Sequence, residues 1–171
     1  MTHTLAEFAA RCHDILKADP GPAGREKVCE VVKEMLGTPD FIAAHLPADG
    51  PERKIIYQDK ELGFCILAHV YQDAKGSPPH DHGPSWAIYG QAMGTTIMTD
   101  WEVVEPASEG KPGTARPVRH YELTPGMAYC YDPGVLHSPR RDGPTRLIRM
   151  EGVDVSKIRR LAYRPVAEAT A

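Results

Sequence analysis

Hydrophobic positions in the first third of the chain recur at the three- and four-residue spacing that is typical of amphipathic helices. In residues 4–17 the apolar side chains fall on one face: Leu5, Phe8, Ala9, Cys12 and Leu16. A second helix is expected from about Ala23 to Leu36, after a break at Asp19-Pro20-Gly21-Pro22. A short third helix is expected up to His45, capped by Thr38 and with Pro39 at its first position.

From Arg53 onward the pattern changes to short β-branched and aromatic runs that are separated by turn sequences such as Thr124-Pro125-Gly126. The expected strands cover residues 54–57, 64–71, 86–89, 93–104, 118–123, 127–131 and 145–150. Short strands at this spacing indicate a sandwich or a barrel. We therefore expect a mainly β fold, with a helical segment over 1–50 and a barrel over 51–171 in one structural unit. Residues 165–171 are expected to form a frayed tail.

Composition narrows the class of protein further. With 171 residues, 42% of them hydrophobic and a net charge of −3, the chain suits one globular domain and not a nucleic-acid-binding surface. No apolar run approaches the roughly 20 residues of a membrane helix, and no secretion signal is visible at the N-terminus. The cysteines form no CxxC pair, so we expect buried free thiols and a cytoplasmic location: Cys12, Cys29, Cys65 and Cys130.

Histidines provide the strongest chemical signal. His80 and His82 stand at alternate positions, so on a strand both imidazoles would point to the same side. A second segment has a tight turn, Asp132-Pro133-Gly134, three residues before His137. Imidazole is a common ligand of first-row transition metals, which makes a metal site the leading interpretation. Two solvated loop histidines are the alternative for the first pair.

Together these segments resemble the two signature motifs of the cupin superfamily. The first motif, HxH closed by a glycine, would comprise His80, His82 and Gly94, and the second would run from Gly126 to His137. Proline directly precedes Gly134 here, whereas the family motif places it two residues before. The resemblance covers about residues 53–152. It implies a double-stranded β-helix, or jelly-roll barrel, with the N-terminal helices packed on it, and a divalent transition metal bound by His80, His82 and His137.

One departure from the family pattern is informative. Most cupins have a glutamate where this chain has Ala87. Three neutral ligands would leave the charge of the ion almost uncompensated, which should favour anionic substrates. This three-histidine variant looks like the thiol dioxygenases of the cysteine dioxygenase type, which implies Fe(II) as the favoured metal, with Zn, Ni or Mn as alternatives. The Ser-x-His-x-Tyr relay of that group is missing, because no histidine follows His137.

Further site residues are expected around the metal. In thiol dioxygenases an arginine on an early strand binds the substrate carboxylate, and Arg53, or Lys54 beside it, stands at about the corresponding distance before His80. A solvated cation at the end of a strand is the alternative interpretation. Trp86 and Arg149 are further candidates for substrate binding, although an aromatic on a barrel strand is often core. Tyr89 and Tyr129 are candidate catalytic hydroxyls, as acids or hydrogen-bond donors.

The expected function is therefore a metal-dependent dioxygenase whose partners are O₂ and a small anionic substrate, such as a thiol carboxylate. Two alternatives remain open. One is a cupin isomerase, lyase or hydrolase in which the ion is a Lewis acid, and the other is a non-catalytic cupin that binds a small acid. Neither nucleic acid nor a membrane is an expected partner. A homodimer is left open, since cupins commonly pair.

Overall fold

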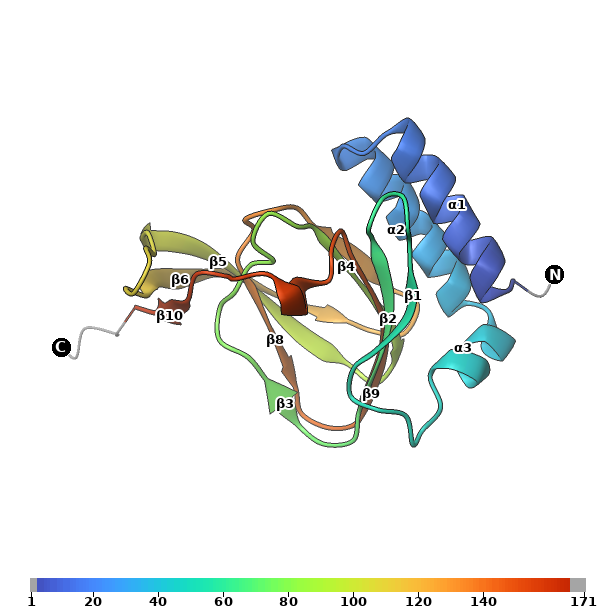
Figure 1. Ribbon diagram of the computed structural model, residues 1–171. Coiled ribbons are helices and arrows are strands. Elements are labelled where there is room, and N and C mark those ends of the chain that lie inside the picture. The colour runs from blue at the N-terminus through green and yellow to red at the C-terminus, as the bar shows by residue number, and fades with distance from the viewer. Residues whose placement is uncertain (1–2, 167–171) are drawn as a thin grey trace.

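Three helices open the chain in this computed structural model, which describes residues 3–166 (Figure 1). They are α1 (Leu5–Ala18), α2 (Pro22–Leu36) and α3 (Pro39–His45). Thr4 caps α1, because its hydroxyl accepts the Glu7 N–H while the Glu7 carboxylate accepts the Thr4 N–H. Thr38 lies at the start of α3 as expected, but its hydroxyl donates to the Glu34 carbonyl of α2 and makes no cap hydrogen bond.

Two five-stranded sheets follow within the described residues. The first sheet has the order β1 (Lys54–Gln58), β2 (Cys65–Tyr71), β9 (Thr145–Glu151), β4 (Ala87–Met93) and β7 (Ala128–Tyr131). The second has the order β10 (Tyr163–Pro165), β6 (Gly113–Leu123), β5 (Thr96–Glu105), β8 (His137–Arg141) and β3 (Lys75–Gly76). A short 3₁₀ helix, η1 (Val155–Lys157), follows β9.

The strand pairing defines the fold. Strand β5 pairs with β6, β4 with β7, β3 with β8, and β2 with β9, all antiparallel. The chain from β2 to β9 is thus one long hairpin, and its successive pairs alternate between the two sheets. A long hairpin rolled up in this way is a jelly roll, the double-stranded β-helix of cupins. The predicted fold class, mainly β with N-terminal helices packed on the barrel, is confirmed.

The two faces of the first sheet have different partners. Alternate residues of β2 and β9, such as Ile66 and Ile148, pack in one core with Phe8, Val28 and Met35 of the helices. The other face points into the barrel, where a smaller apolar cluster joins the two sheets: Ala87, Tyr89, Met98, Leu123 and Tyr131. Figure 1 shows α1 and α2 on the side of the first sheet that faces away from β5 and β6. Because the helices supply the larger core, the barrel interior can accommodate polar side chains.

Several strands differ from the sequence-based expectation. The pattern does not predict β3, β8 or β10, and β6 begins at Gly113, five residues before the expected start at Val118. Part of the predicted tail is paired: Pro165 ends β10, which runs parallel to β6, and Val166 donates its N–H to the Ala115 carbonyl. The rest of that tail, 167–171, lies outside the described residues.

Two further expectations can be compared with the structure. The four cysteines are free, with Cys12, Cys29 and Cys65 buried and Cys130 half-buried. Burial raises the pKa of the Cys29 and Cys65 thiols to about 11. Within residues 3–166, no helix is both long and apolar enough to span a membrane.

Candidate metal centre

Two of the three candidate ligands face each other across an antiparallel bridge. His80 donates its N–H to the His137 carbonyl at 3.0 Å, and His137 donates its N–H to the His80 carbonyl at 2.9 Å. Residues that exchange both hydrogen bonds project their side chains to the same face of the sheet. Just before β8, the Asp132-Pro133-Gly134 turn reverses the chain, with Gly134 at a φ of +80°. This turn sets the position of His137, the third candidate ligand.

His82 reaches the same place from a loop and not from a strand. The expectation of two alternate strand positions is therefore wrong in detail, since only His80 is paired with β8. The loop turns at Gly83, which has a φ of +61° and donates its N–H to the Asp81 carboxylate at 2.9 Å. Ser85 then donates its N–H to the His82 carbonyl at 3.1 Å. This turn directs the His82 ring into the barrel, where it is buried.

One nitrogen of each of the three rings lies within 4.8 Å of the others. The Nδ1 atoms of two rings face carbonyl oxygens: that of His80 is 3.0 Å from the Pro78 oxygen, and that of His137 is 3.1 Å from the Val135 oxygen. These contacts fix the Nδ1–H tautomer and leave Nε2 with a free lone pair, the arrangement that metal-binding histidines require.

The residues present fit a divalent cation. Nε2 of His82 is 3.0 Å from Nε2 of His137, and only one proton can lie between them. Burial lowers the pKa of His80 to about 4 and that of His137 to about 3, and it also lowers the pKa of His82. All three rings are therefore neutral at neutral pH, the form that coordinates metals. A cation shared by three lone pairs would stabilise this arrangement.

Tyr89 contacts two of the ligands. Its hydroxyl oxygen is 3.2 Å from Nε2 of both His82 and His137, and the residue is only 1% exposed. Arg149 donates a hydrogen bond to the same oxygen, and its guanidinium lies over the Tyr89 ring at 4.5 Å from the centroid. Burial raises the pKa of Tyr89, so the phenol is neutral. Because Arg149 donates to the oxygen, the phenol proton is directed towards the imidazole nitrogens.

A buried carboxylate, that of Glu151, lies next to Arg149. Glu151 is fully buried on β9, directly opposite Ala87, the position at which most cupins have a glutamate. Its carboxylate accepts the Val155 N–H at 3.2 Å and forms ion pairs with Arg53 at 3.4 Å and Arg149 at 3.6 Å. The metal-binding cluster in the described residues comprises only the three histidines. Glu151 therefore compensates the charge of the arginines.

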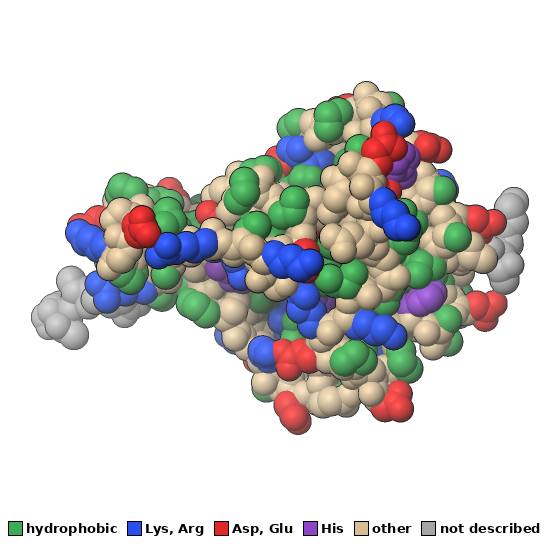
Figure 2. All heavy atoms as spheres, viewed as in Figure 1, with side chains coloured by type: hydrophobic (Ala, Val, Ile, Leu, Met, Phe, Trp, Pro, Cys, Tyr) green, Lys and Arg blue, Asp and Glu red, His purple; other side chains and the backbone are tan. Residues whose placement is uncertain are grey.

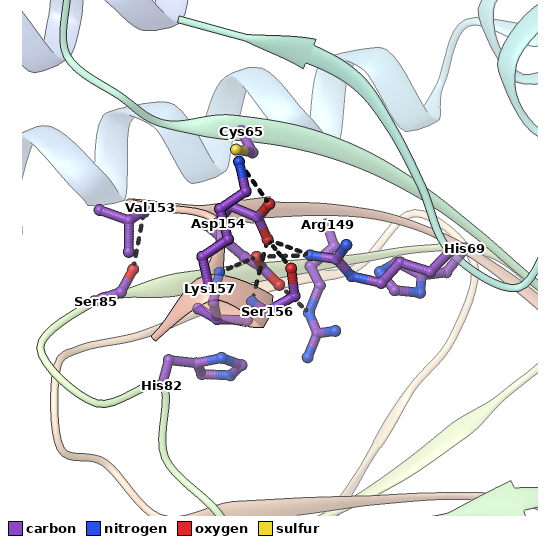
Figure 3. A network of polar contacts seen from close by, with 12 residues as sticks. Cys65, His69, His82, Ser85, Arg149, Val153, Asp154, Ser156 and Lys157 are labelled. Carbon is purple, nitrogen blue, oxygen red and sulfur yellow. Dashed lines mark hydrogen bonds and ion pairs between the residues drawn. The ribbon is translucent and has the colours of Figure 1, made fainter. Parts of the chain in front are cut away.

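Glu151 belongs to a wider polar network beside the metal centre. Arg53 also donates to the Asp154 carboxylate at 3.0 Å, which in turn accepts hydrogen bonds from the N–H and the hydroxyl of Ser156. Figure 3 shows this network around Asp154, with Arg149 and His69 to one side of it and His82 below. His69 is buried, and only its Nδ1 has a partner, the Tyr71 hydroxyl at 3.2 Å.

A cavity of about 480 Å³ opens beside His80. Five cationic side chains line it, and none of its lining residues is acidic: the cations are Arg53, Lys75, Arg141, Arg149 and Arg160. Lys and Arg side chains gather across the middle of the face shown in Figure 2. Such a concentration of positive charge attracts small anions.

The predicted substrate-binding and catalytic residues divide into two groups. Arg53 and Arg149 line the cavity, and Tyr89 contacts the ligands. Trp86 packs with the core on the helix side of the first sheet and does not line the cavity. Tyr129 points into the barrel, but its ring packs against Tyr121 at a centroid distance of 5.0 Å and contacts none of the three histidines.

Two further residues lie near the site: Tyr131, which the sequence offers beside Tyr129 as a candidate hydroxyl, and Arg141, which it does not single out. Tyr131 stacks on the His137 ring, with centroids 4.2 Å apart, and its hydroxyl lies 2.6 Å from that of Tyr121. Arg141 lines the cavity from β8, four residues after His137. Residues 137, 139 and 141 of one strand share a face, but this relationship becomes visible only once β8 is known to be a strand.

The similarities found among known proteins are limited to solved structures. No protein-family model and no curated protein matches this sequence. Among solved structures, the chain is similar to a cupin superfamily protein from Desulfitobacterium hafniense, with 9% identity, a TM-score of 0.44, and 64% of this chain and 84% of that chain covered. It is also similar to a cupin-2 domain containing protein from Shewanella frigidimarina, with 12% identity, a TM-score of 0.42, and coverages of 66% and 88%.

A third similar structure is KdgF from Halomonas sp., with 17% identity, a TM-score of 0.42, and coverages of 58% of this chain and 74% of that chain. All three TM-scores lie below 0.5. The fold is therefore assigned from the strand pairing described above, and the site from its own geometry.

Proposed function

We propose that this chain is a metal-dependent dioxygenase of a small anionic substrate, with a thiol carboxylate as the first candidate and Fe(II) as the favoured metal. The main support is the convergence of three neutral imidazoles, without a carboxylate ligand, beside a cavity lined by cations. Three ligands on one side of an octahedral ion leave positions at which substrate and O₂ can meet. The overall reaction would convert a thiol and O₂ into a sulfinic acid, with both oxygen atoms added to sulfur.

The chain's own residues have three tasks in this proposal. Arg149 and the other cavity cations attract the anion and orient it towards His80. The buried Tyr89 hydroxyl, 3.2 Å from two ligand nitrogens, holds a proton within reach of a group bound at the centre. Arg149 positions that hydroxyl through its hydrogen bond. Together, Tyr89 and Arg149 take the place of the missing histidine-containing relay.

The first experiment measures the metal content of the protein as isolated and then the O₂ uptake of the Fe(II)-loaded protein. Cysteine and 3-mercaptopropionate are compared with cysteamine, which lacks a carboxylate, and the sulfinate product is quantified by mass spectrometry. We expect one O₂ consumed per sulfinate formed, and faster turnover of the thiol carboxylates. A His82→Ala variant is the inactive control. Absence of O₂ uptake with every thiol would contradict the thiol dioxygenase proposal.

A Lewis-acid enzyme is the second candidate, and Tyr89 is the observation that favours it. A neutral phenol beside a cation can serve as a general acid without any oxidant. This alternative predicts zinc, nickel or manganese in the isolated protein, no O₂ uptake, and a Tyr89-dependent reaction of a hydroxy acid. A non-catalytic acid-binding protein would instead retain its ligand without turnover.

A further inference from the structure

Among residues 3–166, Arg141 is a buried cation without an acidic partner. It is only 4% exposed, and its Nε is buried with no hydrogen-bond partner. Within the described residues its guanidinium forms no ion pair. The group that supports it is the face of the Tyr71 ring, 4.2 Å from the guanidinium carbon to the centroid. An ionised side chain that is removed from water without an opposite charge or hydrogen-bond acceptors beside it destabilises the folded state.

The other four cavity cations all have partners. Arg53 pairs with Asp154 at 3.0 Å, and Lys75 pairs with Glu52. Arg149 donates to Tyr89 and lies 3.6 Å from the Glu151 carboxylate. Arg160 donates to the Asp81 carbonyl at 2.9 Å. Arg160 is exposed and its acceptor is a neutral carbonyl, so Arg141 is the buried cation of this cavity that, within the described residues, has neither an acidic partner nor a hydrogen-bond acceptor.

The position of Arg141 relates it to the metal centre. His137 and Arg141 lie on one face of β8, four residues apart, which corresponds to about 13 Å along a strand. His80 and Arg141 both line the cavity, so a small molecule in it can face the metal ligands at one end and Arg141 at the other. The side chain of Arg141 offers a planar fork of donors that suits a carboxylate or a similar oxyanion.

We infer that Arg141 binds a second anionic group of the substrate, so that the substrate is a small dianion with one end at the metal centre and the other at Arg141. The inference specifies the substrate of the proposed function, and it rests on that function only for the end of the substrate that binds the metal. The site at Arg141 is formed by the protein alone. It can therefore be tested in metal-free protein, independently of any oxygenase activity.

The test uses glutarate as a dianionic probe and isothermal titration calorimetry. Metal-free wild-type protein should bind glutarate, and Arg141→Gln should weaken the binding at least tenfold. Arg140→Gln is the matched control, because Arg140 is the exposed neighbour on the opposite face of β8 and pairs with Asp142. The control should bind glutarate like the wild type. Equal binding by wild type and Arg141→Gln, or equal weakening by both variants, would overturn the inference.

A second measurement tests the claim that the ligand has two anionic ends. Protein loaded with Ni(II) is compared for binding of glutarate and of pentanoate, which has one carboxylate on the same number of carbons. Glutarate should bind at least tenfold more tightly than pentanoate, since only glutarate can occupy both ends. Equal affinities would reject the dianion and leave a single-anion site. If glutarate binds as expected but no thiol is oxidised, the proposed function fails while the anion site stands.

Thermal unfolding separates a binding role of Arg141 from a structural one. Met can keep the contact with the Tyr71 ring without a charge. Arg141→Met should therefore unfold at a higher temperature than the wild type when no anion is present. Glutarate should raise the unfolding temperature of the wild type and leave that of the variant unchanged. A variant that is less stable than the wild type without anion would show that Arg141 is needed for the fold, contrary to the inference.

Discussion

Asp132 accepts two hydrogen bonds from Arg25, one from Nε at 3.0 Å and one from Nη2 at 2.9 Å. Arg25 is buried in α2, where it also donates to the Pro20 carbonyl at 3.0 Å. Asp132 begins the turn that precedes His137. The helical segment thus restrains the loop that positions His137, the third candidate metal ligand.

Replacing Arg25 should therefore affect both stability and metal binding. Arg25→Met removes charge-assisted hydrogen bonds, and we expect it to lower the free energy of unfolding by about 1.5–3 kcal/mol. Metal affinity should fall severalfold as the turn loosens. Urea unfolding of metal-free protein and calorimetric titration with Zn(II) measure the two effects. Arg11→Gln is the control. The Arg11–Glu34 ion pair between α1 and α2 is exposed, so it should contribute less than about 1 kcal/mol to the free energy of unfolding.

Loss of one ligand should abolish tight metal binding. His80→Ala and His137→Ala each remove one of the three nitrogens of the cluster. We expect the metal content to fall to background. The affinity for metal should drop by more than the 10–100-fold that is typical when a residue hydrogen-bonded to a metal ligand is replaced. His120→Ala is the control, because His120 is exposed and hydrogen-bonded to Thr99. Retention of one metal per chain in His137→Ala would rule out the three-histidine centre.

Removing the Tyr89 hydroxyl should reduce activity without removing the metal. In Tyr89→Phe the three nitrogens remain, but the proton donor is lost, and we expect turnover to fall about 100-fold, at the low end for acid–base residues. Arg149 loses a buried acceptor, so stability should also fall by about 1–3 kcal/mol. Tyr129→Phe should change neither turnover nor metal content, since Tyr129 does not contact the ligands. Similar kinetic losses in both variants would argue against a specific role for Tyr89.

Acid should destabilise the metal-free protein in a defined pH range. In the folded state, burial lowers the pKa of His80 to about 4 and that of His137 to about 3, from the ordinary histidine value of 6.5. Below pH 6.5 the unfolded chain binds protons that the folded chain does not, so the free energy of unfolding falls as the pH decreases towards 4. Each such histidine contributes about 1.4 kcal/mol per pH unit.

Urea unfolding between pH 7.5 and 5 measures this slope. His80→Gln should reduce the slope of unfolding free energy against pH by the contribution of one histidine, whereas His120→Gln should leave the slope unchanged. Stability that is constant or rises with acidification over this range would contradict the assignment of neutral, buried imidazoles.

The sequence predicts the centre better than its surroundings. His80, His82 and His137 are identified because the HxH spacing and the Pro-Gly turn are local patterns with a direct geometric meaning. The inward position of Tyr89 follows from strand alternation. Trp86 precedes β4 and packs towards the helices, and no local pattern distinguishes the two faces of a sheet that is covered on both sides.

Other features depend on contacts that a sequence does not display. Strand β8 contains Pro139 and two arginines, a composition that argues against a strand until its pairing with β5 is known. Arg141 is then a buried cation on an unpredicted strand. Tyr129 and Tyr131 alternate in the same way, and only the three-dimensional position of His137 determines that Tyr131 contacts it.

The long hairpin from β2 to β9 also has a kinetic consequence. His82 and His137 are 55 positions apart, and the strands β4 to β7 that lie between them pair with one another. The ligands can converge only after this intervening chain has folded, a long-range closure of the kind that slows folding. A metal ion therefore finds its complete site late on the folding pathway. Binding should prolong the lifetime of the native protein by slowing unfolding, with little effect on the rate at which the chain first folds.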